Sequence, residues 1–239
     1  MANPAQRRAV DALVCEALDH LDGGRLAAAE QCISAASVHA ADAAQVRFAR
    51  AQLYAAQGRE GLAAKELAAA CAKDPCHADA HYAMGCLHEA AGDHHATVSC
   101  FLTVLRLDAA ADRRDNIGTL ADRARIEHIA TRVLDGLPDR FSRPLASIPI
   151  QLLARPSEDL VREGFDPRAL GLFEGAQAGD AIGFEGVRTT PSRIVLFYGN
   201  LLATSDDASL ADEVEVTLLH EIGHFFGLDE DGVAALGLA

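Results

Sequence analysis

The chain has 239 residues, half of them hydrophobic, which is enough for one large or two small globular domains with a buried core. Its formal net charge of -14 at pH 7 opposes binding to phosphate backbones and anionic membranes, so we expect neither nucleic acid nor membrane as a partner. The sequence shows no apolar run typical of a membrane span or secretory signal, which favours a cytoplasmic protein whose six cysteines are thiols.

The first part of the chain predicts an all-α domain made of three similar units. Gly24, Gly58 and Gly92 follow one another at intervals of 34 residues. A glycine can end a helix in a left-handed turn, so each marks the bend of a helical hairpin. Positions that follow each glycine carry a small residue and then a large apolar one, while a large ring precedes it. These positions hold Ala29, Ala63 and Thr97; Ile33, Leu67 and Phe101; and His20, Tyr54 and His88.

This pattern resembles the tetratricopeptide repeat (TPR), with units near residues 10–43, 44–77 and 78–111. The resemblance implies a helical-repeat domain over residues 1–111 that recruits a protein partner or substrate. An unrelated helical bundle is the alternative. The remainder, residues 112–239, then forms a second domain.

That second domain reads as α+β. A helix over 117–134 precedes short apolar runs at 148–153 and 193–198, which have the composition of strands. The glycine-rich stretch 164–186 between them predicts loops with a short hairpin at most. A final helix begins near Ser209, which we expect to form an N-terminal capping pair with Asp212.

One motif in this last helix carries chemistry. His220 and His224 are four residues apart, so they stand on one face and can hold a single Zn²⁺. Glu221 is turned about 100° from the first histidine, where it can reach a metal-bound water without binding the metal. Two histidines and a glutamate in a strongly apolar helix are costly unless a ligand satisfies them. A chance helix with polar residues on its outer face is the alternative.

The run from His220 to Asp231, His-Glu-Ile-Gly-His-Phe-Phe-Gly-Leu-Asp-Glu-Asp, resembles the bacterial minimal zincin-like metallopeptidase family. Segments 134–138, 170–175 and 193–197 add to a likeness that covers roughly residues 117–235. The resemblance implies a small zincin-like α+β domain. It also implies peptide hydrolysis by zinc-activated water, with Glu221 as the general base.

The resemblance further implies a third protein ligand beyond Gly227. In the related metzincin arrangement this ligand lies ten residues after the first histidine, which is Glu230 here. Asp229 is the first alternative, and Asp231 or a residue from another segment the next. No methionine follows the motif, since the methionines are Met1 and Met84, so the chain lacks the turn of a true metzincin.

Three weaker expectations complete the site. A substrate chain is expected to pair with the strand at 193–198, and Tyr198 is a less favoured donor to the oxyanion. Four residues close in sequence form a less favoured second metal site: Cys71, Cys76, His77 and His81.

The sequence therefore predicts a zinc metallopeptidase joined to a repeat module, with Zn²⁺ as cofactor and a protein or peptide as substrate. Two alternatives remain. One is a zincin fold that has lost activity and serves as a binding scaffold, and the other is a zinc hydrolase of non-peptide amides or esters.

Overall fold

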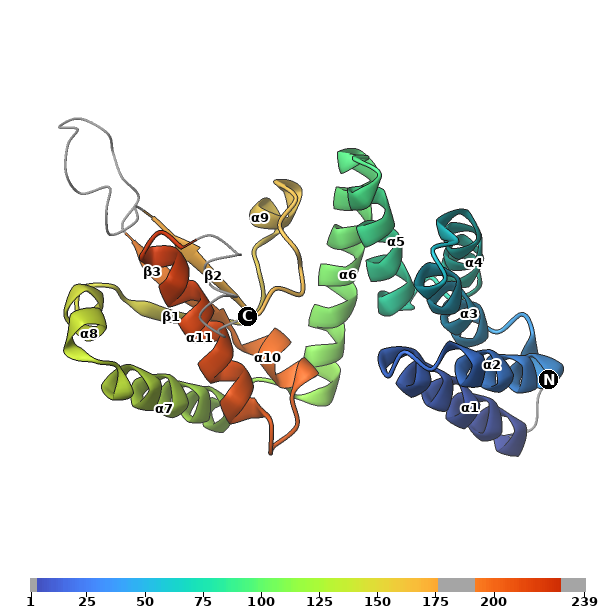
Figure 1. Cartoon of the computed structure of the whole chain (residues 1–239), viewed down its shortest axis with the longest axis horizontal. Coiled ribbons are helices and arrows are strands. Elements are labelled where there is room, and N and C mark those ends of the chain that lie inside the picture. The colour runs from blue at the N-terminus through green and yellow to red at the C-terminus, as the bar shows by residue number, and fades with distance from the viewer. Residues whose placement is uncertain (1–3, 176–191, 229–239) are drawn as a thin grey trace. The chain divides into compact units, whose positions relative to one another are not determined.

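The computed structural model describes residues 4–175 and 192–228 and divides the chain into two compact units. The first unit runs to Leu107 and also takes in Val161–Gly164. The second comprises Asp108–Leu160 and the residues from Phe165 onward. Figure 1 shows helices in the first unit, and helices around a small sheet in the second.

The first unit is built from successive helices joined by short turns. They are α1 (Pro4–Asp22), α2 (Leu26–Ala40), α3 (Ala44–Ala56), α4 (Glu60–Lys73), α5 (Ala78–Ala90) and α6 (His94–Asp115), of which the last continues beyond Leu107. The turns within the three pairs contain Gly24, Gly58 and Gly92, with φ values of 68°, 70° and 74°. These angles are strained for residues with a side chain, which explains the 34-residue glycine period.

Packing inside these pairs follows the small and large positions of the repeat. Ala29, Ala63 and Thr97 are buried where the second helix of each pair meets the first, as are Ile33, Leu67 and Phe101. In the third pair Gly85 lies so close to the Phe101 ring that a Cβ on it would come within 2.5 Å. The TPR-like, all-α prediction for this region is confirmed.

The second unit holds a three-stranded mixed sheet. Its elements are α7 (Leu120–Gly136), α8 (Asp139–Leu145), β1 (Ile150–Leu153), β2 (Gly171–Glu174), β3 (Arg193–Phe197), α10 (Tyr198–Thr204) and α11 (Leu210–Phe225), and a short α9 (Glu158–Arg162) lies between β1 and β2 along the chain. The strand order is β1-β3-β2, with β1 parallel and β2 antiparallel to β3. One core joins Ile194 and Leu196 of β3 to Ile126 of α7 and Leu218 of α11. The α+β prediction is confirmed.

Two local predictions for this unit are wrong. β3 is the central strand and pairs on both sides, so the stretch 193–198 has no free edge for a substrate. The edge strands are β1 and β2, and β2 forms inside the glycine-rich stretch for which the sequence predicted loops with a short hairpin at most. Ser209 does precede α11, but its hydroxyl donates to Asp206 Oδ1 at 2.8 Å and makes no capping bond.

A buried polar network holds the chain that leads into β2. Asn200, 1% exposed, donates from Nδ2 to the carbonyls of Pro167 (3.0 Å) and Ala169 (2.6 Å). Its Oδ1 accepts from Arg155, whose guanidinium also donates to Asp112 at 2.6 and 2.8 Å. Since buried carbonyls need donors, this network fixes the path of residues 167–169 just before the strand.

All six cysteines are free thiols, as expected. Of the helices in the described ranges, none combines the length and apolar character needed to cross a membrane.

Candidate metal centre

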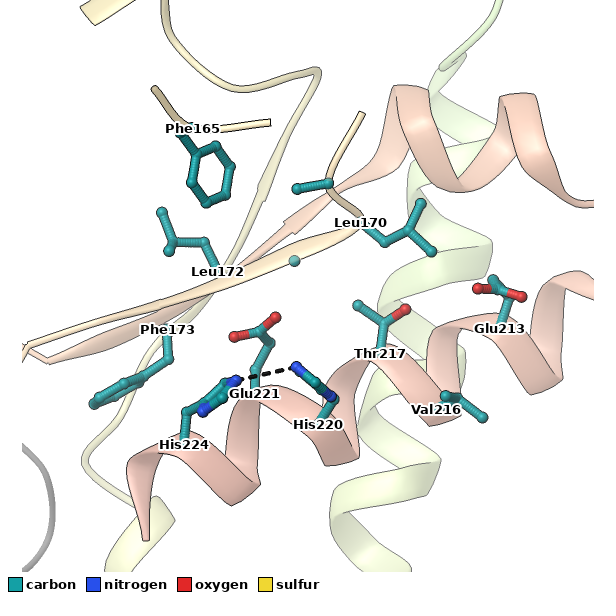
Figure 2. Close-up of a pocket in the computed structure, with 12 residues that line it drawn as sticks. Phe165, Leu170, Leu172, Phe173, Glu213, Val216, Thr217, His220, Glu221 and His224 are labelled. Atoms are coloured by element: carbon teal, nitrogen blue, oxygen red, sulfur yellow. Dashed lines mark hydrogen bonds between the residues drawn. The ribbon is translucent and has the colours of Figure 1, made fainter. Parts of the chain in front are cut away.

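The two histidines of the motif converge near the C-terminal end of α11. His220 Nε2 and His224 Nε2 are 3.0 Å apart (Figure 2). Two nitrogens bound to one tetrahedral Zn²⁺ at 2.0–2.1 Å would be about 3.3 Å apart. The helix therefore presents both ring nitrogens at nearly the spacing that such an ion requires.

The hydrogen bonding of His224 sets which nitrogen carries its lone pair. The Nδ1–H of His224 donates to the carbonyl of Leu228 at 3.1 Å. A neutral imidazole bonded in this way has its lone pair on Nε2, the nitrogen that faces His220. Leu228 reaches this position because Gly227, with φ of 80°, turns the chain back after the helix. This donor set fits zinc.

Glu221 lies beside the histidines and faces β2. Its side chain is buried, with the residue 7% exposed, and it stands on the side of α11 that packs against the strand. A Cβ on Gly171 would come within 2.8 Å of Glu221 Oε1 and 2.9 Å of Thr217 Cγ2. The missing side chain at position 171 thus makes room for the carboxylate.

A cavity of about 590 Å³ lies between β2 and α11. One wall is apolar and comes from residues 169–173 with Phe165, and α11 supplies the other wall. The residues of α11 that line it are Glu213, Val216, Thr217, His220, Glu221 and His224. A cavity of this size suits a segment of peptide or a small molecule.

The part of β2 that lines this cavity includes Gly171, Leu172 and Phe173. Leu170 and Leu172 stand opposite Phe197 and Val195, and the carbonyl of Leu170 accepts from the Phe197 amide at 2.8 Å. Hydrogen-bonded and non-bonded pairs alternate along antiparallel strands. Gly171 and Phe173 therefore direct their backbone N–H and C=O groups away from β3, and Gly171 does so next to Glu221.

The candidate third ligands and Tyr198 are the remaining residues predicted for this centre. Glu230, Asp229 and Asp231 lie outside the described residues, so the third ligand stays a prediction. Tyr198 does not line the cavity; it begins α10, and its ring lies 5.6 Å from the Arg123 guanidinium.

The second metal site predicted near Cys71 does not assemble, because its histidines have other roles. His77 caps α5 by accepting from the Ala80 amide at 3.3 Å, and its ring packs against Phe48. His81 Nε2 lies 3.2 Å from the carbonyl of Pro75. Within the described ranges, Cys71, Cys76, His77 and His81 form no group with metal-ligand spacing.

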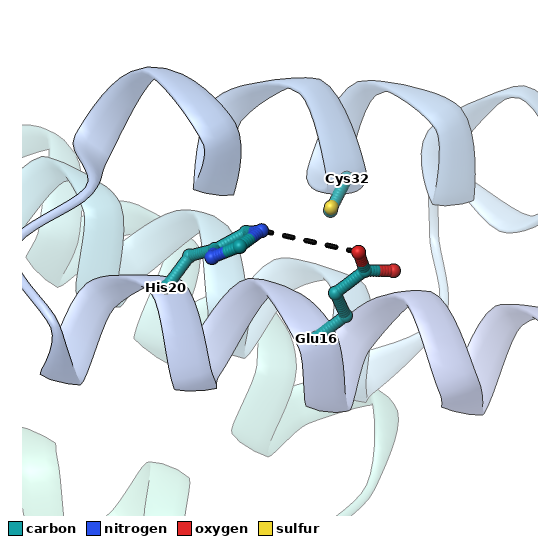
Figure 3. Close-up of side chains that lie close together, drawn as sticks. All are labelled: Glu16, His20 and Cys32. Carbon is teal, nitrogen blue, oxygen red and sulfur yellow. Dashed lines mark ion pairs between the residues drawn. The ribbon is translucent and has the colours of Figure 1, made fainter.

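A different cluster with such spacing was not predicted: Glu16, His20 and Cys32, drawn in Figure 3. Arg25 Nε donates to His20 Nδ1 at 2.9 Å, so His20 Nε2 carries the hydrogen and faces Glu16 at 3.9 Å. Burial, together with the Glu16 carboxylate, raises the pKa of the Cys32 thiol. A protonated nitrogen and a protonated thiol are poor ligands, so we interpret this cluster as a polar contact between α1 and α2.

The comparisons with known proteins cover curated proteins, solved structures and family models. No curated protein matches the chain. Among solved structures, a mutant O-GlcNAc transferase from Thermobaculum terrenum matches with a TM-score of 0.40 and 19% identity. The match covers 64% of this chain and 32% of the transferase chain, and at that score it supports no functional argument.

The family comparison is more informative. Residues 145–238 match the family model described as zincin-like metallopeptidase, and this range contains β1, β2, β3 and the histidine helix. Over residues 145–238 the chain is therefore similar to the zincin-like metallopeptidase family.

Proposed function

We propose that the protein is a zinc-dependent peptidase. This is a specific form of the zinc-hydrolase function that the family match indicates. The observation that carries the proposal is the convergence of His220 Nε2 and His224 Nε2 beside a buried Glu221, at the edge of a strand. Zn²⁺ held by these histidines and a third ligand, for which we propose Glu230 with Asp229 as alternative, would supply Lewis acidity and lower the pKa of a coordinated water.

The substrate chain would pair with β2, in place of the strand first expected. Gly171 and Phe173 line the cavity, and no strand in the described part of the chain pairs with their outward backbone groups. A peptide laid there would gain backbone hydrogen bonds as an added strand. Because Gly171 adjoins Glu221, such a strand would bring a backbone carbonyl next to the carboxylate.

Glu221 then does the proton transfers. Its carboxylate accepts a proton from the attacking water and returns it to the nitrogen of the leaving amine. Burial between α11 and β2 limits the contact of this carboxylate with bulk water to the side that lines the cavity, and Gly171 leaves room for it there. The Nδ1 bond of His224 to Leu228 holds that ring in position during the reaction.

The test of this function measures zinc and hydrolysis in the same variants. Glu221→Gln should keep about one Zn²⁺ per chain and lose peptide hydrolysis by roughly 10²–10⁴-fold, which is the contribution of a general base. The double change His220→Ala and His224→Ala should lose the zinc, as measured by elemental analysis. Glu215→Gln, on the exposed side of α11, is the matched control and should change neither quantity.

Three results would overturn the peptidase. Equal turnover by the wild type and Glu221→Gln would show that Glu221 is not the general base. Stoichiometric zinc in the double-histidine variant would place the metal elsewhere. Zinc without cleavage of any peptide would favour the scaffold, or a hydrolase of non-peptide amides if a panel of such amides is turned over instead.

The repeat half has a proposed role of its own. We propose that residues 1–111 recruit a protein partner or substrate for the domain at residues 112–239, in the cytoplasm. Stacked helical hairpins form an extended surface suited to such binding.

A further inference from the structure

Two rows of side chains run along the cavity face of α11. Glu213, Thr217 and Glu221 form one row, because residues four apart lie above one another on a helix. The contacts of Thr217 and Glu221 with the Gly171 position show that this row faces β2. Val216, His220 and His224 form the second row. The two rows end in Glu213 and Val216, at the N-terminal end of the cavity (Figure 2).

Glu213 differs from the other two acidic residues in the N-terminal half of this helix. It is half-buried and lines the cavity, whereas Asp212 and Glu215 are exposed and lie outside it. Among residues 4–175 and 192–228 its carboxylate forms no ion pair and no side-chain hydrogen bond. An acidic residue in the first turn stabilises a helix by interacting with the helix dipole, and Asp212 is also in the first turn of α11. The dipole does not explain why the carboxylate of Glu213 lines the cavity.

The neighbours of Glu213 are apolar. Val216, one turn along α11, is 43% exposed, and Leu170 approaches from the start of β2. A carboxylate next to apolar surface matches a side chain with an aliphatic stem and a cationic head, which describes Lys and Arg. Residues 112–239 also carry 22 acidic against 12 basic residues, so the domain attracts cations over a longer range.

The position of Glu213 sets a distance from the reacting bond. It precedes Glu221 by eight residues, or about 12 Å at 1.5 Å per helical residue. An extended peptide advances about 3.3 Å per residue, so that distance corresponds to about three to four residues of substrate.

We propose that Glu213, Val216 and Leu170 form a subsite for a Lys or Arg side chain of the substrate, about three to four residues from the cleaved bond. The cavity thereby selects cationic peptides. This inference rests on the proposed peptidase function, so its test separates binding from cleavage.

The binding experiment uses the full chain with Glu221→Gln and ten-residue fluorescent peptides of Ala, Ser and Leu. One Lys is moved along the peptide and compared with norleucine, Gln and Glu at the same place. At one position Lys should bind about five- to tenfold more tightly than norleucine, by fluorescence anisotropy. Adding Glu213→Gln should remove that preference, while the norleucine peptide keeps its affinity within about twofold. Adding Glu213→Lys should favour the Glu peptide.

Glu215→Gln in the same background is the matched control and should leave the Lys preference intact. Equal affinities of the Lys and norleucine peptides overturn the subsite, as does a preference that survives Glu213→Gln or the absence of measurable binding by every peptide. Thermal melting of Glu213→Gln should match the parent; a large loss with no change in selectivity would assign Glu213 to the helix dipole and also overturn the subsite.

Hydrolysis by the wild type keeps the two proposals apart. If the Glu221→Gln chain shows the Glu213-dependent preference and the wild type cleaves nothing, the peptidase fails and the subsite stands. If the wild type cleaves neutral and cationic peptides at equal kcat/KM, the subsite fails and the peptidase stands.

Discussion

At the scale of single residues, Gly171 sets how closely β2 approaches Glu221. Its φ is not in the left-handed region, so the backbone does not demand glycine there. Glycine is required there for steric reasons, because a Cβ would come within 2.8 Å of the Glu221 carboxylate and 2.9 Å of the Glu221 Cγ. A side chain at this point has to displace either the strand or the base.

We therefore expect Gly171→Ala to impair hydrolysis while the protein stays folded. A shift of about 1 Å in a reacting group can cost up to about 10²-fold, so kcat/KM for a neutral peptide should fall by about ten- to a hundredfold. Zinc content should stay near that of the wild type, because the atoms nearest to this position belong to Glu221 and Thr217 and not to the histidines. Gly136→Ala is the control, since a Cβ there meets nothing within 4 Å. Wild-type turnover by Gly171→Ala would show that the contact does not position Glu221.

The sequence predicts some of these residues and misses others for a physical reason. His220, Glu221 and His224 are recognisable because one turn of helix brings residues four apart together, so their geometry is local. Gly171 lies fifty positions upstream of Glu221, and nothing in the local pattern indicates that the two meet. Glu213 has a helical spacing from Glu221, but it lines the cavity only together with residues 169–173, and the sequence did not indicate how that segment packs.

At the scale of elements, the same distinction separates the two units. The helical hairpins depend on turns between neighbouring helices, so the period of Gly24, Gly58 and Gly92 predicted them well. The sheet depends on pairing between β1, β2 and β3, which are distant in the chain. The apolar run of β3 indicated a strand but not a central one. The short, glycine-containing β2 has too little pattern to indicate more than a possible hairpin in its stretch.

Helix α7 offers a test of element stability, because it has a complete capping box. Asp122 accepts from the hydroxyl and amide of Thr119, each at 2.8 Å, and the Asp122 amide donates to the Thr119 hydroxyl at 3.2 Å. The hydrogen bonds from the Thr119 side chain, then its backbone, hold the pKa of Asp122 below its ordinary 3.8. Ile126 and Ile129 of α7 lie in the same core as residues of α11. The cap that stabilises α7 therefore also supports the helix that carries His220 and His224.

Asp122→Ala should lower the free energy of unfolding by about 1 kcal/mol at pH 7, as measured in urea. A carboxyl whose pKa is lowered by folding stabilises the protein above about pH 3.8 and ceases to do so as pH falls through the folded-state pKa. The gap between wild type and variant should therefore narrow below that pH. Glu127→Ala, exposed on the same helix, should show no such dependence. If the difference in unfolding free energy between wild type and variant stays constant down to pH 2, the charge of Asp122 is not the source of that difference.

At the scale of the whole molecule, α6 raises the question of where the second domain begins. The proposed boundary at 111/112 cuts inside this helix, which runs without a break from His94 to Asp115. The second compact unit instead begins at Asp108. Asp108 accepts from Arg168 Nε at 2.9 Å and lies 3.4 Å from Arg155, whose side chain is 7% exposed. An autonomous second domain therefore needs the turn of α6 that precedes residue 112.

Two fragments of the chain test this inference. Residues 106–239 keep Asp108 and a full turn of helix ahead of Asp112, whereas residues 112–239 lose Asp108 and leave Asp112 at a fraying end. The shorter fragment should be less stable by about 2–4 kcal/mol in urea, because the nearly buried Arg155 loses one partner and has the other loosened. The longer fragment carrying Asp108→Ala should have a stability between those of the two fragments. This variant separates the contribution of the Asp108 ion pair from that of the additional helix turn. Equal unfolding midpoints for both fragments would contradict this inference and place the start of the domain at residue 112. The zinc content of each fragment would show whether the metal centre depends on the helix turn that precedes residue 112.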